Sequence, residues 1–494
     1  MSSITRRGLR VNSLRSTFSS RTSSAPSSSR PRCFATTPTR WKATTDMSAQ
    51  EIAGLKVKQD RLMNDIHYSC QWGPGERWGD AETETGMSRL SLSDTDKSAR
   101  DWFISTVHSL GCTTTVDSMG NIFAIRPGTS PGPPTFAGSH LDTQPTGGRY
   151  DGILGVTAGI EMLRVLHEHD VQTAFPVGVV NWTNEEGARF PISMVSSGVW
   201  AGEIKESHAH NLQEVGGGTA TMKSELERIG YLGSTKASHE AIPMAAHFEL
   251  HIEQGPILEA EGRKVGVVQG VQAYKWFTIE VKGRDCHTGT TSFAHRADAM
   301  LAASKMIVYS HRVAKRRGAL ASTGILRLWP GSTNTVPGTV RFSLDIRSPR
   351  DEVVEEVEKE CRAGFERLVN GEDVDGINKD FHESDRHCEV KWTTDSVSPA
   401  VLFHKNTIKC VESATKDLFG EQAEAMSKPM TSGAGHDSVY TSKRVPTSMI
   451  FVPCRDGVSH NPAEYSTLED CAIGAQVLTG AVLHYDRLRA SRGG

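Results

Sequence analysis

The sequence predicts an α/β protein in which a second, smaller domain of βαββαβ order interrupts the first. Two observations indicate the α/β class. Short apolar segments at 135–141 and 176–183 are typical of buried strands, and an amphipathic helix is expected between them at 155–167. The third observation is a change of pattern near Gln272, where the order of expected elements becomes βαββαβ.

The first domain is expected to begin with helices. Apolar residues at helical spacing predict one helix over 50–66 and another that is capped by Ser93 or Asp94 and ends near Leu110. A turn at Met119-Gly120-Asn121 predicts a hairpin. The remaining elements expected before the insertion are a helix near 221–228 and an alternating strand over 247–255.

The inserted domain has strands at 273–281, 321–329, 339–346 and 388–392, and helices at 294–312 and 352–368. This order is the ferredoxin-like plan. The first domain then resumes with a helix at 400–418, a strand at 447–452 and a helix at 468–488. The expected segments are therefore 1–45, 46–271, 272–393 and 394–494.

The composition excludes several classes of protein. A hydrophobic content of 37% fits a globular protein, and no apolar run approaches the roughly 18 residues that span a membrane. The nine cysteines are scattered, without a CxxC pair, which argues against a disulfide framework and favours a reducing compartment. We expect neither a membrane protein nor a secreted, disulfide-stapled one.

The first 45 residues differ from the rest of the chain. They hold eight arginines and one lysine, many serines and threonines, and no acid before Asp46. This composition is typical of a mitochondrial transit peptide; the alternative is a disordered tail on a cytoplasmic protein. Removing these nine cations from the net charge of −3 leaves about −12, which argues against nucleic-acid binding.

The stretch Gly138-Ser139-His140-Leu141-Asp142 ends a predicted strand, and Asp151 follows a glycine-rich loop at the start of the next helix. Ligands bind at such strand ends in open α/β sheets. Imidazole and carboxylate both suit Zn²⁺. Taken alone, the pair His140 and Asp151 fits a core histidine and a capping aspartate equally well.

Three further strand ends carry residues of the same kind. Glu185 and Glu186 follow the strand at 176–183, and because side chains alternate along a strand they should point in different directions. His251 lies on the polar face of the strand at 247–255, and His460 lies in the loop after the last strand. Five ligand-type residues placed in this way indicate a metal site, namely His140, Asp151, Glu186, His251 and His460.

This set of motifs resembles the hydantoinase/carbamoylase branch of the metal-dependent aminoacylase/carboxypeptidase superfamily. The resemblance spans residues 86 to 465 and is most specific at His251-Ile252-Glu253-Gln254-Gly255 and Ser432-Gly433-Ala434-Gly435-His436-Asp437. It is also carried by Gly138-Ser139-His140-Leu141-Asp142-Thr143, Asp151-Gly152, Asn184-Glu185-Glu186-Gly187, His287-Thr288-Gly289 and Ser459-His460-Asn461-Pro462. It implies a zinc-exopeptidase-like catalytic domain with an inserted lid and dimerisation domain.

The resemblance implies two divalent ions per chain, zinc first and manganese as the alternative. Asp151 would bridge them, with His140 and His251 on one ion and Glu186 and His460 on the other. Glu185 would then be the general base. Asp142, two residues after His140, is expected to hold the far ring nitrogen of that histidine.

On the substrate side the resemblance implies Gln254, His287, Asn334, Arg347, Gly435 and His436. Arg347 would hold the substrate carboxylate through two hydrogen bonds. His287 would polarise the scissile carbonyl, either in its own subunit or across a homodimer formed by residues 272–393. Closure of the lid is expected around hinges at 270–272 and 393–398.

The expected activity is hydrolysis of an N-carbamoyl amino acid to the amino acid, CO₂ and ammonia, with N-carbamoyl-β-alanine as the first choice. Allantoate and N-carbamoyl-L-α-amino acids share the ureido group and the carboxylate, so they remain alternatives. An exopeptidase or aminoacylase is a further alternative within the superfamily. A non-catalytic binding protein on this fold is the alternative of another class, although it would have no need of Glu185.

Overall fold

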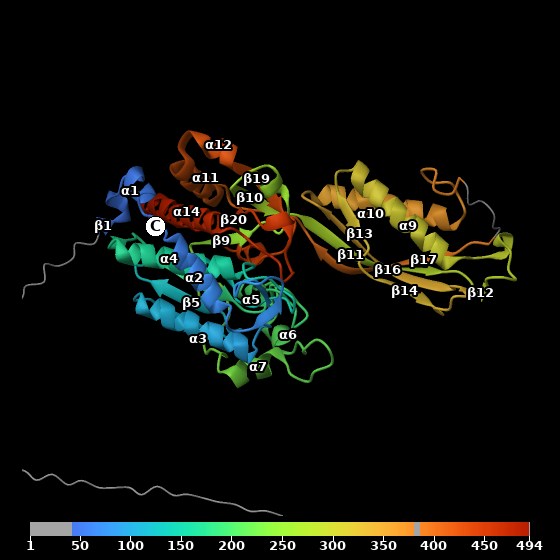
Figure 1. The fold of residues 1–494 in the computed structure, drawn as a ribbon, viewed down its shortest axis with the longest axis horizontal. Helices are drawn as coiled ribbons and strands as arrows, with labels where there is room; N and C mark the ends of the chain where they lie inside the picture. The colour runs from blue at the N-terminus through green and yellow to red at the C-terminus, as the bar shows by residue number, and fades with distance from the viewer. Residues whose placement is uncertain (1–41, 380–385, 494) are drawn as a thin grey trace, which may run out of the picture. The chain divides into compact units, whose positions relative to one another are not determined.

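The computed structural model describes residues 42–379 and 386–493 (Figure 1). Their buried apolar side chains form three hydrophobic clusters. Two of these belong to a larger unit, made of residues before 272 and after 400, and the third belongs to the stretch between them. No helix in the described part of the chain is long and apolar enough to cross a membrane. The predicted transit peptide lies outside the described residues up to position 41, and mitochondrial import stays a prediction.

The first part of the larger unit contains ten strands and eight α-helices within the described residues. In chain order they are β1 (Lys42–Ala43), α1 (Ala49–Ala53), α2 (Gln59–Ser69), β2 (Pro74–Arg77), β3 (Thr85–Met87), α3 (Asp94–Ser109), β4 (Thr113–Val116), β5 (Ile122–Arg126), β6 (Thr135–His140), α4 (Ile153–Glu168), β7 (Val171–Gln172), β8 (Val177–Trp182), α5 (Val195–Trp200), α6 (Glu206–His210), α7 (Met222–Ile229), β9 (Ala246–Ile252), α8 (Ile257–Ala260) and β10 (Val265–Val271).

The chain returns to this unit after the insertion. The returning elements are β18 (Val401–Leu402), α11 (Lys405–Phe419), α12 (Ala423–Met426), β19 (Ser427–Ser432), α13 (Ser438–Thr441), β20 (Thr447–Val452) and α14 (Leu468–Arg492). Its main sheet has the strand order β18-β10-β20-β9-β6-β8-β5-β4, and β19 pairs with β10. The four neighbours β20, β9, β6 and β8 run parallel, so their carboxyl ends meet at one edge.

Both faces of this sheet are covered. On one face α4 packs so closely that a Cβ atom at Gly159 would lie 2.8 Å from a methyl group of Val179. On the other face Trp200 of α5 packs edge-on against Trp182 of β8, with 5.7 Å between ring centroids. Parallel strands that are covered by helices on both faces bury nearly all of their side chains. This burial explains why the segments 135–141 and 176–183 are apolar throughout.

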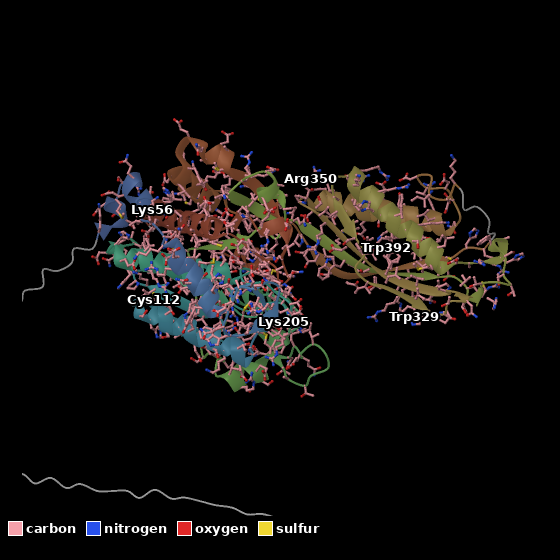
Figure 2. The ribbon with its side chains drawn as sticks, in the orientation of Figure 1. Lys56, Cys112, Lys205, Trp329, Arg350 and Trp392 are labelled. Atoms are coloured by element: carbon pink, nitrogen blue, oxygen red, sulfur yellow. The ribbon has the colours of Figure 1, made fainter. Side chains whose placement is uncertain are left out.

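The insertion contains β11 (Ala273–Lys282), β12 (Cys286–His287), α9 (Ala299–Arg316), β13 (Leu320–Ser322), β14 (Leu326–Trp329), β15 (Thr335–Val336), β16 (Thr339–Ser348), α10 (Asp351–Val369) and β17 (Glu389–Ser398). The strand order is β13-β16-β11-β17, with β14 also on β16, and all these pairs are antiparallel. Of the two tryptophans labelled in Figure 2, Trp392 is partly buried and packs on Phe277 at the edge of the core, whereas Trp329 is 45% exposed.

Several predicted boundaries are wrong. The helix expected over 50–66 is interrupted after α1, at Gly54, and resumes as α2. The strand expected to end at Trp392 continues to Ser398 in the sheet of the insertion, so the chain returns at Pro399 rather than within 393–398. Strand β18 replaces the start of the helix expected from Ala400.

The N-terminal boundary expected at residue 45 stays a prediction, although residues 42–44 already contact the larger unit. Lys42 and Ala43 pair with β7, and Thr44 is buried. The hydroxyl group of Thr44 donates to the carboxylate of Asp486 on α14, which also accepts the N–H groups of Ala174 and Phe175. Residues 42–44 are therefore packed into the larger unit.

Candidate metal centre

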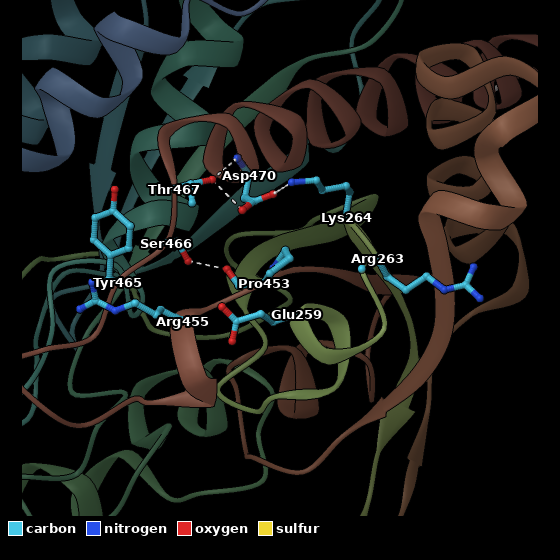
Figure 3. A pocket seen from close by; sticks show the side chains of 10 residues that line it. Glu259, Arg263, Lys264, Pro453, Arg455, Tyr465, Ser466, Thr467 and Asp470 are labelled. Atoms are coloured by element: carbon cyan, nitrogen blue, oxygen red, sulfur yellow. Dashed lines mark hydrogen bonds and ion pairs between the residues drawn. The ribbon is translucent and has the colours of Figure 1, made fainter.

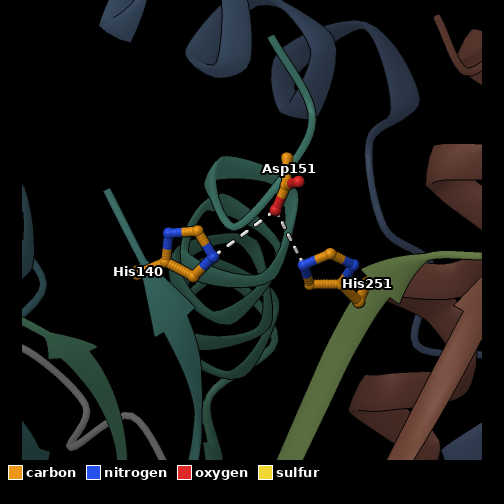
Figure 4. A group of neighbouring side chains, drawn as sticks. All are labelled: His140, Asp151 and His251. Atoms are coloured by element: carbon orange, nitrogen blue, oxygen red, sulfur yellow. Dashed lines mark ion pairs between the residues drawn. The ribbon is translucent and has the colours of Figure 1, made fainter. Parts of the chain in front are cut away.

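Asp151, just before α4, is the shared member of two groups of potential metal ligands. Its Oδ1 atom lies 3.0 Å from Nε2 of His251 and 3.5 Å from Nε2 of His140 (Figure 4). Its Oδ2 atom lies 3.4 Å from Nε2 of His460. In each group one ligand atom per residue lies within 4.8 Å of the others, the groups being His140, Asp151, His251 and Asp151, Glu186, His460.

The two histidines of the first group are held with their Nε2 atoms toward Asp151. Nδ1 of His140 lies 2.9 Å from the main-chain oxygen of Asp142, and Nδ1 of His251 lies 2.9 Å from that of Ile252. Because a carbonyl oxygen only accepts, each Nδ1 atom carries a proton, and Nε2 is the nitrogen that faces Asp151 and could bind a metal ion. The Nε2 atom of His140 is buried without a hydrogen-bond partner among the described residues, as expected of a metal ligand.

This geometry corrects the expectation for Asp142. Its main-chain oxygen, not its carboxylate, holds the far ring nitrogen of His140. The carboxylate instead accepts the N–H groups of Glu185 and Glu186, each at 3.3 Å. Asp142 therefore links the end of β6 to the loop after β8, and it positions the two glutamates rather than the histidine.

Glu185 and Glu186 diverge at the end of β8, in agreement with the alternation expected from the sequence. Oε2 of Glu185 lies 3.6 Å from Nε2 of His140, and Oε2 of Glu186 lies 3.5 Å from Nε2 of His460. Burial and the neighbouring carboxylates raise the pKa of Glu185 well above its ordinary value. Burial and Asp151 raise the pKa of Glu186 to about 7.

A glycine next to Asp151 makes room for the first ligand. Gly152 has φ of +67°, and a Cβ atom there would lie 2.3 Å from the ring of His140. A side chain at this position would therefore displace the histidine as well as strain the backbone. The Asp-Gly pair of the sequence is explained by these two constraints.

Glu464 is a site residue that the sequence did not reveal. It is buried and accepts the N–H groups of Tyr150 and Asp151, each at 3.0 Å, as well as the hydroxyl group of Ser459 at 2.8 Å. That hydroxyl group also lies 3.1 Å from Oδ2 of Asp151. Burial and Asp151 raise the pKa of Glu464 to about 7. Glu464 stands in a loop of ordinary composition, and only its position four residues after His460 in the sequence could have indicated a role in the site.

Gln144 was also missed, and Gln254 was predicted. The side-chain amide of Gln144 donates to Oε2 of Glu186 at 2.7 Å, so this residue fixes one ligand of the second group. The amide of Gln254 donates to Oδ2 of Asp151 at 2.7 Å. Both residues border the cavity in front of the ligands, as the prediction for Gln254 requires.

That cavity has a volume of about 220 Å³ and brings residues of the insertion to the ligand groups. His436 borders it with its ring 4.5 Å from that of His251, and burial and His251 lower its pKa to about 3. Gly435 also lines it, where a Cβ atom would meet Met194 at 2.8 Å. The lining from the insertion consists of Tyr274, Trp276 and Arg347.

Arg347 reaches the cavity but is already engaged. Its Nε and Nη2 atoms lie 3.0 Å and 2.9 Å from Oδ2 of Asp345, and its Nη1 atom donates to the carbonyl oxygen of Gly433 at 2.8 Å. The prediction did not include the pairing with Asp345. A guanidinium has five N–H donors, so one donor on each Nη atom remains for a ligand.

His287 and Asn334 do not join the cavity of their own chain. Strand β12, which carries His287, pairs with β15 directly after Asn334, and both side chains are exposed. Nδ1 of His287 accepts the N–H of Gly289 at 3.0 Å. The expected contact of these two residues with the substrate is therefore absent within the described residues of one subunit.

A larger cavity of about 310 Å³ lies near the start of α14 (Figure 3). Nζ of Lys264 lies 2.8 Å from a carboxylate oxygen of Asp470 there, so the two charges neutralise each other. None of the residues that line this cavity belongs to either ligand group. Size alone therefore does not identify the functional site, and the smaller cavity is the candidate.

Fold and site together define a metal-dependent hydrolase of the zinc-exopeptidase type. Residues 136–484 match the model of Peptidase family M20/M25/M40. The chain belongs to this family, and within it to the hydantoinase/carbamoylase branch. It is a hydrolase of C–N bonds other than peptide bonds in linear amides, and the fold class predicted from the sequence is confirmed.

Two relatives and one solved structure illustrate the similarity. The chain is 38% identical to an N-carbamoyl-L-amino-acid amidohydrolase of Rhizobium meliloti, over 87% of this chain and 96% of the relative. It is 31% identical to an allantoate amidohydrolase of Bacillus subtilis, over 86% and 97%. An amidase of the hydantoinase/carbamoylase family from Burkholderia multivorans superposes with a TM-score of 0.77 and 38% identity, over 88% and 99%.

Replacing Glu464 by alanine should weaken metal binding without removing a ligand. The N–H groups of Tyr150 and Asp151 would lose their acceptor, and the shared carboxylate would lose its fixed orientation. We expect the affinity for Zn²⁺ to fall by about 10- to 100-fold, measured by competition with a chromophoric chelator. Asp456→Asn, in the same loop but exposed, is the control. An unchanged affinity in Glu464→Ala would contradict this role.

Proposed function

We propose that the protein hydrolyses the carbamoyl group of an N-carbamoyl amino acid, giving the amino acid, CO₂ and ammonia. The observation that carries the proposal is the buried Glu185 beside two ligand groups that share Asp151. The relative from Rhizobium meliloti is named for N-carbamoyl-L-amino acids, so these substrates are placed first. N-carbamoyl-β-alanine, the first choice from the sequence, and allantoate stand second.

The ligand groups fit two divalent cations. His140, His251 and Asp151 would hold one of them, and Glu186, His460 and Asp151 the other. Imidazole and carboxylate donors favour Zn²⁺ and also accept Mn²⁺. Such a pair of cations supplies Lewis acidity, which polarises a carbonyl group and acidifies water.

Glu185 is the proton carrier in this proposal. It takes a proton from the attacking water and then delivers a proton to the leaving nitrogen. These two transfers require a group that acts first as a base and then as an acid. Its burial and the nearby carboxylates raise its pKa, as expected of a glutamate that must both take up and release a proton. Asp142 keeps the glutamate in place through the N–H group at 3.3 Å.

Ammonia release from a panel of ureido acids tests the proposal, with Glu185→Gln as the inactive comparison. The panel holds N-carbamoyl-L-methionine, its D-enantiomer, N-carbamoyl-β-alanine, allantoate and a dipeptide. We expect turnover of the L-α-substrate by the zinc-loaded protein. Glu185→Gln should lower kcat by about 10²- to 10⁴-fold and leave KM nearly unchanged, because it removes proton transfer alone.

Glu203→Gln is the matched control, since Glu203 pairs with Lys443 and Arg444 and does not line the cavity in front of the ligand groups. Its kinetics should equal those of the wild type. Cleavage of the dipeptide alone would assign an exopeptidase instead. Turnover in Glu185→Gln at the wild-type rate would remove Glu185 from the mechanism.

Arg347 is proposed to hold the substrate carboxylate through its two remaining N–H donors. Lysine would keep the charge but lose this fork and the bonds that orient it on Asp345. We therefore expect Arg347→Lys to raise KM about tenfold, equivalent to about 1.4 kcal/mol, with unchanged metal content. Arg341→Lys, on the exposed side of the same strand, is the control. Wild-type KM in Arg347→Lys would place the carboxylate elsewhere.

We further propose a homodimer in which His287 and Asn334 serve the site of the partner subunit. Both side chains are exposed and lie apart from the cavity of their own chain. The insertion also exposes several large apolar side chains, which a second copy would cover. They are Leu301, Val308, Leu320, Ile325, Leu326 and Trp329.

Mixing two inactive variants tests this arrangement. Glu185→Gln keeps His287, and His287→Ala keeps Glu185, so a mixed dimer would contain one complete site if His287 acts across the interface. Refolding or co-expressing the two variants in equal amounts should restore about a quarter of the wild-type activity. No restoration, or a monomeric mass by light scattering, would contradict the proposal.

A further inference from the structure

Glu249 is a buried carboxylate behind the ligand groups. It lies on β9, two residues before His251, and its exposed fraction is 0%. No lysine or arginine acts on the carboxylate of Glu249 among the described residues. A buried carboxylate without such a partner costs free energy unless hydrogen bonds offset the cost.

Three donors from two other elements supply those hydrogen bonds. The hydroxyl group of Ser139, on β6, donates to Oε1 of Glu249 at 2.7 Å. The hydroxyl group of Ser438, at the start of α13, donates to Oε2 at 2.6 Å, and its N–H group lies 3.3 Å from the same oxygen. One carboxylate therefore joins β9, β6 and the segment that leads into α13.

Each of the joined elements carries a residue of the candidate site. Ser139 directly precedes His140, Glu249 shares the polar face of β9 with His251, and Ser438 follows the loop that contains His436. The space for Ser139 is tight, because a Cβ atom at Gly155 would lie 2.7 Å from that of Ser139. The carboxylate thus contacts neighbours of both histidine ligands and of the cavity wall.

The hydroxyl groups of Ser139 and Ser438 supply the side-chain hydrogen bonds on which the buried Glu249 depends. An apolar side chain of similar size would fill the same space without the free-energy penalty of burying a charge. It could not form the hydrogen bonds that connect β9, β6 and the start of α13.

We propose that Glu249 is a positioning residue that fixes His140 and His251 relative to each other and couples them to the loop of His436. Through Ser139 it acts on the metal-binding geometry, and through Ser438 it acts on the cavity wall. The coupling to substrate rests on the proposed function, whereas the coupling to metal affinity does not.

Two serine variants separate the two links. Ser139→Ala should lower the affinity for Zn²⁺ about tenfold or more, with kcat and KM near wild type once zinc is saturating. Ser438→Ala should raise KM at least about threefold and leave zinc affinity unchanged. Glu249→Leu should show both effects, and Glu249→Gln, which keeps an acceptor oxygen, should recover part of each.

Ser448→Ala is the matched control. Ser448 is a buried serine of the adjacent strand β20, and its hydroxyl group has no hydrogen-bond partner among the described residues. It should change neither zinc affinity nor KM. If Glu249→Leu does not fold, the two serine variants still decide the question.

The proposal is overturned if Ser139→Ala and Ser438→Ala match Ser448→Ala in both measurements, or if all variants lower only the melting temperature. If no ureido acid is hydrolysed even by the wild type, the proposed function fails. A selective loss of zinc affinity in Ser139→Ala would in that case still support the positioning role of Glu249.

Discussion

The arrangement of the site depends on the placement of one carboxylate, that of Asp151. Its two oxygen atoms face different groups of ligands, so a small rotation of the side chain would disturb both groups together. The protein fixes this side chain from the main-chain side through Glu464 and from the Oδ2 side through Ser459. Gly152 then leaves room for His140 next to it.

The fold makes this placement achievable with residues that are distant in the sequence. Because β6, β8, β9 and β20 are parallel neighbours, their carboxyl ends bring His140, Glu185 and His251 to one edge. The loops there are held by buried polar groups, among which Asp142 and Glu249 link neighbouring strands. The strand order therefore determines which residues lie next to one another at the site. The hydrogen bonds of the buried carboxylates then fix the relative positions of these residues.

The sequence was most informative where the spacing of apolar and polar residues shows which side chains are buried. Alternation at Glu185-Glu186 correctly indicated two directions, and the apolar runs indicated the central strands. It was least informative where contacts depend on main-chain atoms or on partners close by in space. No sequence pattern indicates that the carbonyl group of Asp142 holds His140 or that Glu464 accepts main-chain N–H groups. Strands β10 and β19 were not expected from the sequence either. The Asp345–Arg347 pair, two residues apart on one strand face, could have been anticipated.

The connection between the two units is itself a paired ladder. Gln272 joins β10 to β11, and Pro399 and Ala400 join β17 to β18, while Gly270 and Val271 pair with Leu402 and Val401. The two crossings between the units are thus tied to each other by main-chain pairing. Any change in their spacing would have to break these bonds, so a displacement of Arg347 would be coupled to the edge of the main sheet.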